Sequence, residues 1–243
     1  MAFRILAATA ALACAATSAN ATIVTVFSDF DSGFASFAAT VTAAGGTQSN
    51  RVLIAGESGN PADFGDFTIA RNNGGMLVVG AAYGLFGASP ARSTTGGAIV
   101  INPIGPNTVP RGNPLDYKGS GVTLVFDSPI NALGFEVGDW ATCCQPSDLY
   151  IQFGSNAPIT VGQSRTYGDQ FLTNGGAGVF VAAFDDSGDF TTVSFWGDGI
   201  GEFLVMGGTI RYALLDRGSL PTPAPAALAL FGLGLAALGL RRR

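Results

Sequence analysis

The chain alternates short apolar segments with turn-forming residues, and this spacing limits what it can fold into. About a dozen segments of strand length are bounded by Gly, Pro, Asn, Asp or Ser, a pattern that predicts short β-strands. Glycine is abundant, with 35 residues, and only 12% of residues are charged, which argues against helical bundles and coiled coils. The predicted strands are Thr22–Ser28, Ser36–Thr42, Asp66–Arg71, Met76–Tyr83, Ala98–Asn102, Val122–Asp127, Ala132–Asp139, Leu149–Gly154, Ile159–Val161, Val179–Asp185, Phe190–Trp196 and Leu204–Leu214.

Alternation within these segments indicates how the strands face a core. Leu149, Ile151 and Phe153 share one face, with Tyr150 and Gln152 on the other. Residues 33–45 come nearest to helical periodicity, but their threonines, valine and glycines favour a strand. The sequence therefore predicts an all-β fold, a single β-sandwich that is jelly-roll-like, over residues 22–218.

The N-terminal residues 1–21 have the layout of a signal peptide, which is helical before its removal. Arg4 supplies the positive n-region and residues 5–16 the apolar h-region. Ala19 and Ala21 fit the small-x-small rule for cleavage, which predicts a mature chain that begins at Thr22. A lipoprotein signal that uses Cys14 is the alternative. Either signal delivers the chain to the Sec translocon.

Residues 219–243 predict a membrane tail. A proline-rich stretch precedes the uncharged apolar segment 226–240, and Arg241, Arg242 and Arg243 follow it. This length is at the lower limit for a transmembrane helix, and cations after a span stay on the cytoplasmic side. The tail would place the domain outside the cytoplasm, tethered to the inner membrane. A C-terminal helix packed on the domain is the alternative.

The prolines, short span and basic end together resemble the PEP-CTERM sorting signal of Gram-negative bacteria that produce exopolysaccharide. Pro223 and Pro225 match its Pro-Glu-Pro element, whereas Ala224 stands where glutamate is expected. The resemblance implies an exosortase-like partner that processes the tail and passes the protein to the cell surface or the extracellular space.

Composition excludes several functions. Residues 22–218 carry eight basic and 17 acidic residues, a net charge of −9, so nucleic acid is not an expected partner. Histidine is absent, which removes Ser-His-Asp and Cys-His catalysis and the usual zinc, copper and non-haem iron ligand sets. Cations, neutral glycans or other proteins remain as partners.

Adjacent cysteines, Cys143 and Cys144, are the only thiols left after signal removal. Exposed thiols seldom persist in an oxidising compartment. A disulfide between neighbours is strained, because their Cα atoms lie about 3.8 Å apart, below the usual range. A disulfide within the pair, pairing between molecules and a purely structural turn all stay open.

An acidic turn is the candidate metal site. Asp185, Ser187 and Asp189 offer oxygen atoms at alternating positions, as calcium prefers, but the spacing does not match an EF-hand. The alternative is a solvated turn. Calcium is the one candidate cofactor, and Asp139, Asp148, Asp198 and Glu202 are candidates for its further ligands.

Carboxylates beside tryptophans are the other candidate sites. Glu136 and Asp139 flank Trp140, and Asp198 and Glu202 follow Trp196. A pair of carboxylates near aromatic residues is the least that a glycosidase needs for catalysis. Trp140 and Trp196 are also candidates for stacking on sugars, with Tyr83, Tyr117, Tyr150 and Tyr167. Half-buried rim residues are the alternative for each.

The sequence thus predicts a non-catalytic, exported surface or matrix protein associated with exopolysaccharide or biofilm, with no catalytic residues. A calcium-assisted carbohydrate-binding module is the first alternative. A glycan hydrolase is the second.

Overall fold

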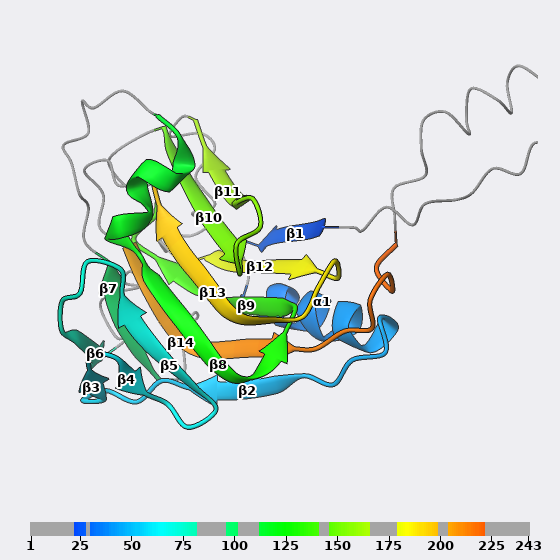
Figure 1. The fold of residues 1–243 in the computed structure, drawn as a ribbon, viewed down its shortest axis with the longest axis horizontal. Helices are drawn as coiled ribbons and strands as arrows, with labels where there is room; N and C mark the ends of the chain where they lie inside the picture. Colours follow the sequence, from blue (N-terminus) through cyan, green and yellow to red (C-terminus); the bar gives the residue numbers. More distant parts are fainter. Residues whose placement is uncertain are drawn as a thin grey trace, which may run out of the picture.

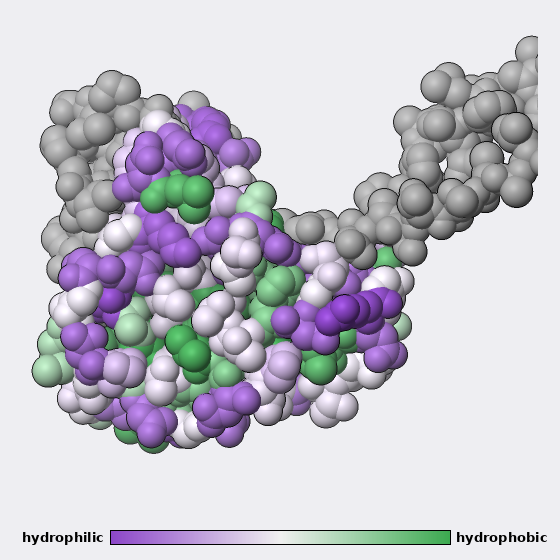
Figure 2. All heavy atoms as spheres, in the orientation of Figure 1, coloured by the Kyte–Doolittle hydropathy of each residue, from purple (hydrophilic) through white to green (hydrophobic). Residues whose placement is uncertain are grey.

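Two antiparallel β-sheets face each other and form a sandwich (Figure 1). The computed structural model describes residues 22–27, 30–81, 96–101, 112–140, 146–165, 179–198 and 204–221. The predicted β-sandwich is confirmed in these residues, which are mostly β-strand, whereas its jelly-roll-like character stays a prediction. Figure 2 shows one face of the domain, where hydrophilic and hydrophobic residues are interspersed.

One sheet has eight strands and contains the first and the last strand of the described chain. Its strand order is β1-β12-β9-β14-β7-β6-β3, and β2 pairs with the second half of β14 beside β7. The strands are β1 (Thr22–Phe27), β2 (Ser49–Val52), β3 (Ser58–Gly59), β6 (Leu77–Ala81), β7 (Gly97–Ile101), β9 (Ala132–Gly138), β12 (Val179–Asp185) and β14 (Leu204–Ala213).

The second sheet has six strands in the order β11-β10-β13-β8-β5-β4. Their bounds are β4 (Ala62–Asp63), β5 (Phe67–Arg71), β8 (Val122–Ile130), β10 (Ser147–Phe153), β11 (Ile159–Ser164) and β13 (Phe190–Gly197). The short strands β2, β3 and β4 escaped sequence analysis, because segments this brief carry too little alternation.

The main core lies between the sheets and follows the predicted alternation. Leu149, Ile151 and Phe153 are fully buried. Phe135 of β9 meets Phe195 of β13 edge-on across the sandwich, with ring centroids 4.8 Å apart. Burying such a side chain stabilises the fold by about 2 kcal/mol.

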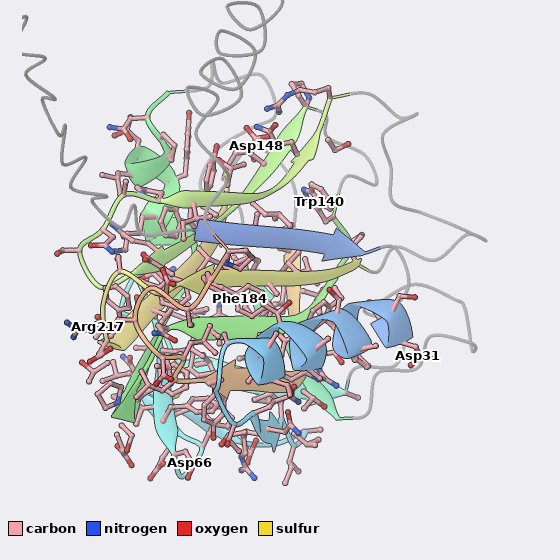
Figure 3. All side chains as sticks on the ribbon, turned by 90° about the vertical axis from the view of Figure 1, so that its right-hand side faces the viewer. Asp31, Asp66, Trp140, Asp148, Phe184 and Arg217 are labelled. Atoms are coloured by element: carbon pink, nitrogen blue, oxygen red, sulfur yellow. The ribbon has the colours of Figure 1, made fainter. Side chains whose placement is uncertain are left out.

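The prediction of a strand at Ser36–Thr42 is wrong, because α1 (Phe30–Ala43) is an α-helix. Phe30, Phe34, Phe37 and Val41 recur every three or four residues and form one apolar stripe. This stripe packs on the outer face of the eight-stranded sheet, where Phe37 stacks on Phe184 at 5.1 Å (Figure 3). The tertiary contact outweighs the strand propensity of the threonines and valine.

The outer face of the six-stranded sheet is covered in part by η2 (Pro114–Ser120), a 3₁₀-helix. Its Tyr117 joins Tyr150 and Trp196 in a small buried cluster, and its Lys118 donates to Gln152 at 2.7 Å. This cover explains why Tyr150 and Gln152, on the face opposite the core, are buried as well.

Among the residues that the structure describes, no helix is both long enough and apolar enough to cross a bilayer. The predicted signal peptide, residues 1–21, and the predicted span 226–240 lie outside those residues.

Candidate functional site

The chain that follows β14 is fastened to the body of the sandwich. We call residues 214–221 the stem. Leu215 and Leu220 are buried in the cluster beneath α1. Asn131, fully buried between β8 and β9, accepts from the Leu215 N–H at 2.7 Å and donates to the Leu215 carbonyl at 3.0 Å. The stem is thus a packed part of the fold up to Leu220, two residues beyond the predicted end of the domain at residue 218.

The turn between β12 and β13 provides two more stem contacts. The buried Asp186 carboxylate accepts from the Leu220 N–H at 2.8 Å. On the surface Arg217 forms a bidentate ion pair with Asp189, in which Nη2 and Nε donate to the two carboxylate oxygens at 2.7 and 3.2 Å. Asn131 also donates to the carbonyl of Gly188 in this turn.

This turn brings the two ends of the described chain together. Thr22, the first residue of β1, pairs with Asp185, and the next carboxylate, Asp186, holds Leu220. The start of β1 and the stem accordingly lie at the same side of the molecule, on the right of Figure 1. The predicted signal peptide and the predicted tail therefore join the domain at one place.

The acidic residues of the turn contact donors of the protein itself. Asp185 accepts from the Asn156 side chain at 2.9 Å and from the Ser187 N–H at 3.1 Å, whereas Asp189 faces Arg217. Within the described part of the chain, no three acidic, cysteine or histidine side chains group as a metal site would need. Calcium binding at this turn stays a prediction.

Both tryptophans are buried rather than displayed. Trp196 has no exposed surface, donates to the Pro114 carbonyl at 2.9 Å and lies under Lys118, whose Nζ is 5.7 Å from the ring. Trp140 is 2% exposed and donates to Ser147 at 2.9 Å. Neither ring has a free face for a sugar in this structure. Tyr117 and Tyr150 are also buried, and Tyr83 and Tyr167 lie outside the described residues.

Glu136 lies in a closed site on the α1 side of the eight-stranded sheet. It is 1% exposed, accepts from the Thr209 N–H at 2.8 Å and faces Arg211 at 3.5 Å. β14 bulges here at Gly208, where φ is 69° and a side chain would collide with the Glu136 carboxylate. Burial raises the pKa of Glu136 to about 7, against the opposing effect of Arg211. The guanidinium in turn lies 3.5 Å from the ring centre of Phe34.

The remaining predicted residues divide between one end of the sandwich and undescribed segments. The Asp148 N–H donates to Asp198 at 3.3 Å, and the Asp148 carboxylate pairs with Arg165. Asp139 has a positive φ of 55°, a conformation that suits the turn after β9. Cys143, Cys144 and Glu202 lie outside the described residues, as do Ala19, Ala21, Pro223, Ala224, Pro225 and Arg241–Arg243.

A cleft at the other end of the sandwich was missed by sequence analysis. It has a volume of about 550 Å³ and opens between the α1–β2 loop, β8 and β14. Figure 3 shows its Asp66 at the edge of the molecule opposite Asp148 and Trp140. The walls carry Thr47, Ser49, Asp66, Asp127, Ser128, Pro129 and Leu214, and the floor has Phe126, Ile130 and Tyr212.

Local backbone irregularities open this cleft. The pairing of β8 with β13 shifts register between Val125 and Ile130, which pushes Asp127, Ser128 and Pro129 outward as a bulge. On the other side α1 ends at Ala43 and is followed by Gly45, whose φ of 76° is a helix C-cap conformation. Pro129, two residues after the predicted strand Val122–Asp127, was the one local signal for the bulge.

Asp66 and Asp127 of the cleft are joined through the backbone, and the Asp66 carboxylate is held by a phenol. The Asp127 N–H donates to the Asp66 carbonyl at 3.0 Å, so the two residues are fixed together. The Tyr212 hydroxyl donates to the Asp66 carboxylate, and burial together with this bond raises the pKa of the phenol. The phenol therefore stays protonated and sets the orientation of Asp66.

Comparisons with solved structures give only distant likenesses. A variant of the module CBM29-2, from a study of ligand recognition by family 29 carbohydrate-binding modules, is 12% identical, with 73% of this chain and 98% of that chain covered and a TM-score of 0.37. A CBM29-2 variant complexed with mannohexaose is 13% identical, with 73% and 99% covered and a TM-score of 0.35. At such scores a common overall fold is not shown.

No curated protein matches the chain in sequence. The model of the PEP-CTERM protein-sorting motif matches residues 221–243. The match confirms the resemblance drawn from the prolines, the apolar segment and the arginines, and it includes Ala224 at the position of the usual glutamate. The chain ends in a PEP-CTERM sorting motif, which indicates that the protein is exported and carries a sorting signal.

Proposed function

We propose that this protein is exported through the Sec translocon, held at the inner membrane as a precursor and passed by an exosortase-type enzyme to the cell surface or the extracellular space. There its sandwich acts without catalysis as a surface or matrix component among exopolysaccharide. PEP-CTERM signals are processed by exosortase, which supports this partner.

The observation that carries the proposal is that the stem is buried and hydrogen-bonded up to Leu220, the residue before the sorting motif. The motif starts at Pro221, directly after Leu220, whose side chain is buried and whose N–H is held by Asp186. Processing within the motif would remove no contact of the described fold. The domain is thus built to stay folded after its tail is cut.

The meeting of the two termini supports the same proposal. A precursor tethered by an uncleaved signal peptide and by its tail would be held at one membrane by both ends. Thr22 pairs with Asp185, and Asp186 binds Leu220, so both ends leave the domain at one turn. The sandwich then needs no rearrangement when either tether is removed.

The test is a chain that ends after Pro221, expressed in the native host from its own promoter. This chain keeps every stem contact that we describe, so a matching urea midpoint will show that its fold is intact. We expect export to the periplasm without delivery to the surface or medium. The control is the full chain with Arg217→Ala, which removes an exposed stem cation but leaves the motif whole. Equal surface delivery of the shortened chain would refute the sorting role.

A carbohydrate-binding role is the second candidate, and the cleft beside Tyr212 is the observation that favours it. Calcium assistance to that role remains a separate proposal. It would need the Asp185–Asp189 turn to exchange its present protein partners for an ion.

A further inference from the structure

We propose that the cleft beside Tyr212 binds a neutral, hydroxyl-rich saccharide, with Asp66 and Asp127 as the hydrogen-bond acceptors. This assigns a ligand class and a site to the second candidate function. It does not depend on how the tail is sorted or cut.

The two carboxylates are free to accept from a ligand. Four ion pairs within the described residues use Glu57, Asp148, Glu136 and Asp189, and none of them involves Asp66 or Asp127. Both cleft residues are exposed to solvent. A carboxylate presents about four acceptor positions, and the Tyr212 hydroxyl occupies only one on Asp66. The cleft therefore offers more acceptor positions than the protein fills.

The hydroxyls on the walls extend this polar surface. Thr47, Ser49 and Ser128 line the same cleft and both donate and accept hydrogen bonds. A ligand that matches them must carry many hydroxyl groups, as a sugar does. Charge selects further, because two carboxylates in a domain of net charge −9 repel an anionic polymer.

Apolar surface accompanies the acceptors, as the C–H face of a sugar ring requires. Pro129 is exposed, and Leu214 is 46% exposed where the stem begins. Beneath them Phe126 and Tyr212 pack together with ring centroids 5.1 Å apart and form a firm floor. The volume of about 550 Å³ lies within the usual range of ligand sites, about 300 to 1,000 Å³.

The cleft is also organised before any ligand arrives. Asp66 and Asp127 are tied together through the backbone, and the phenol of Tyr212 orients one of them. A site fixed in this way loses little conformational freedom when a ligand binds. The Asp66 carboxylate therefore lies at a set position, which favours selection among sugars by the direction of their hydroxyls.

The experiment is isothermal titration of the full chain with three neutral hexasaccharides, one each of gluco, manno and galacto configuration. The chain is kept in a zwitterionic detergent without a sugar headgroup, so that the detergent does not compete. We expect at least one hexasaccharide to bind with a dissociation constant between micromolar and millimolar. Binding of none of them at millimolar concentration would overturn the proposal, as would binding of only a cationic glucosamine hexamer.

Variants then locate the site. Asp127→Asn alone, and with Asp66→Asn, keeps the shape of exposed side chains but removes the charge of the acceptors. We expect the double variant to weaken binding about tenfold or more, the usual effect of losing hydrogen bonds to charged groups. Leu214→Ser should weaken it less. The matched control is Asp116→Asn on η2, which should bind as the parent does. Unchanged binding by the double variant would show that the sugar binds elsewhere and would overturn the assignment.

Discussion

The Asp185–Asp189 turn and the cleft beside Tyr212 both place carboxylates at the ends of strands, yet they differ in what those carboxylates contact. In the turn, Asp185, Asp186 and Asp189 each meet a donor of the protein itself. In the cleft, Asp66 accepts one phenol, and no ion pair in the described part of the chain involves Asp127.

This difference separates structural acidic residues from those available to a ligand. A carboxylate that already accepts from the protein stabilises the fold, because removing it leaves buried donors without partners. A solvated carboxylate on a fixed backbone adds little to stability and is open to another donor. The turn should therefore respond to mutation in stability, and the cleft in binding.

The largest effect is expected at Asn131, which ties the β8–β9 connection to the stem and to the turn. Asn131→Ala would leave the N–H and carbonyl of Leu215 unpaired in a buried place. We expect the free energy of unfolding to fall by about 3 kcal/mol, measured by urea denaturation. Asn113→Ala, which removes an exposed cap of η2, is the control and should cost less than about 1 kcal/mol. Similar losses in both variants would break the contrast between the regions.

A paired substitution makes the comparison direct. Asp186→Ala should lower the free energy of unfolding by about 2 kcal/mol, because it deprives the buried Leu220 N–H of its acceptor. Asp127→Ala in the cleft should change it by less than about 0.5 kcal/mol. Urea midpoints of the two variants measure both values. A large loss at Asp127 would mean that the cleft carboxylate is structural after all.

Glu136 is a third case, a buried carboxylate only partly compensated by Arg211, and it predicts a pH dependence. Its pKa is about 7 in the folded protein against an ordinary 4.5, so the folded state holds the proton more tightly. Its stabilising contribution is full below pH 4.5 and is lost as the pH rises through 7. The loss is on the order of 3 kcal/mol at most.

Glu136→Gln isolates this contribution. Glutamine keeps the size of the side chain and an oxygen for the Thr209 N–H but does not titrate. The difference in urea midpoint between parent and variant should therefore change between pH 4.5 and 7 and stay constant above pH 8. A difference independent of pH would show that Glu136 is already ionised throughout that range.

The smallest effect is expected from calcium. Since the carboxylates of the turn already have protein donors, adding millimolar calcium or a chelator should leave the urea midpoint unchanged. A midpoint that rises with calcium concentration would show an ion bound by the folded state. That result would make the turn a ligand site and remove its contrast with the cleft.

The alternation of apolar residues predicted the two-sheet core well. In a strand such as Leu149–Phe153, the side chains that face the core can be identified from the local sequence alone. The helix α1 was missed because its apolar stripe competes with β-branched residues, and the deciding partner, Phe184, is far away in the chain. The burial of Trp196 could not be predicted from its own strand, because η2, a distant segment of the chain, covers its ring. The cleft was beyond prediction, since it joins Asp66, Asp127 and Tyr212 from three distant segments.

The most direct test of the account is the intact mass of the protein purified from the membrane and extracellular fractions of its native host. We predict a released species that begins at Thr22 and ends between Pro221 and Pro225, directly after the stem. Its mass would also report the oxidation state of Cys143 and Cys144. A protein found only in the membrane and still carrying Arg241–Arg243 would contradict sorting and release. It would also contradict the proposed role at the cell surface.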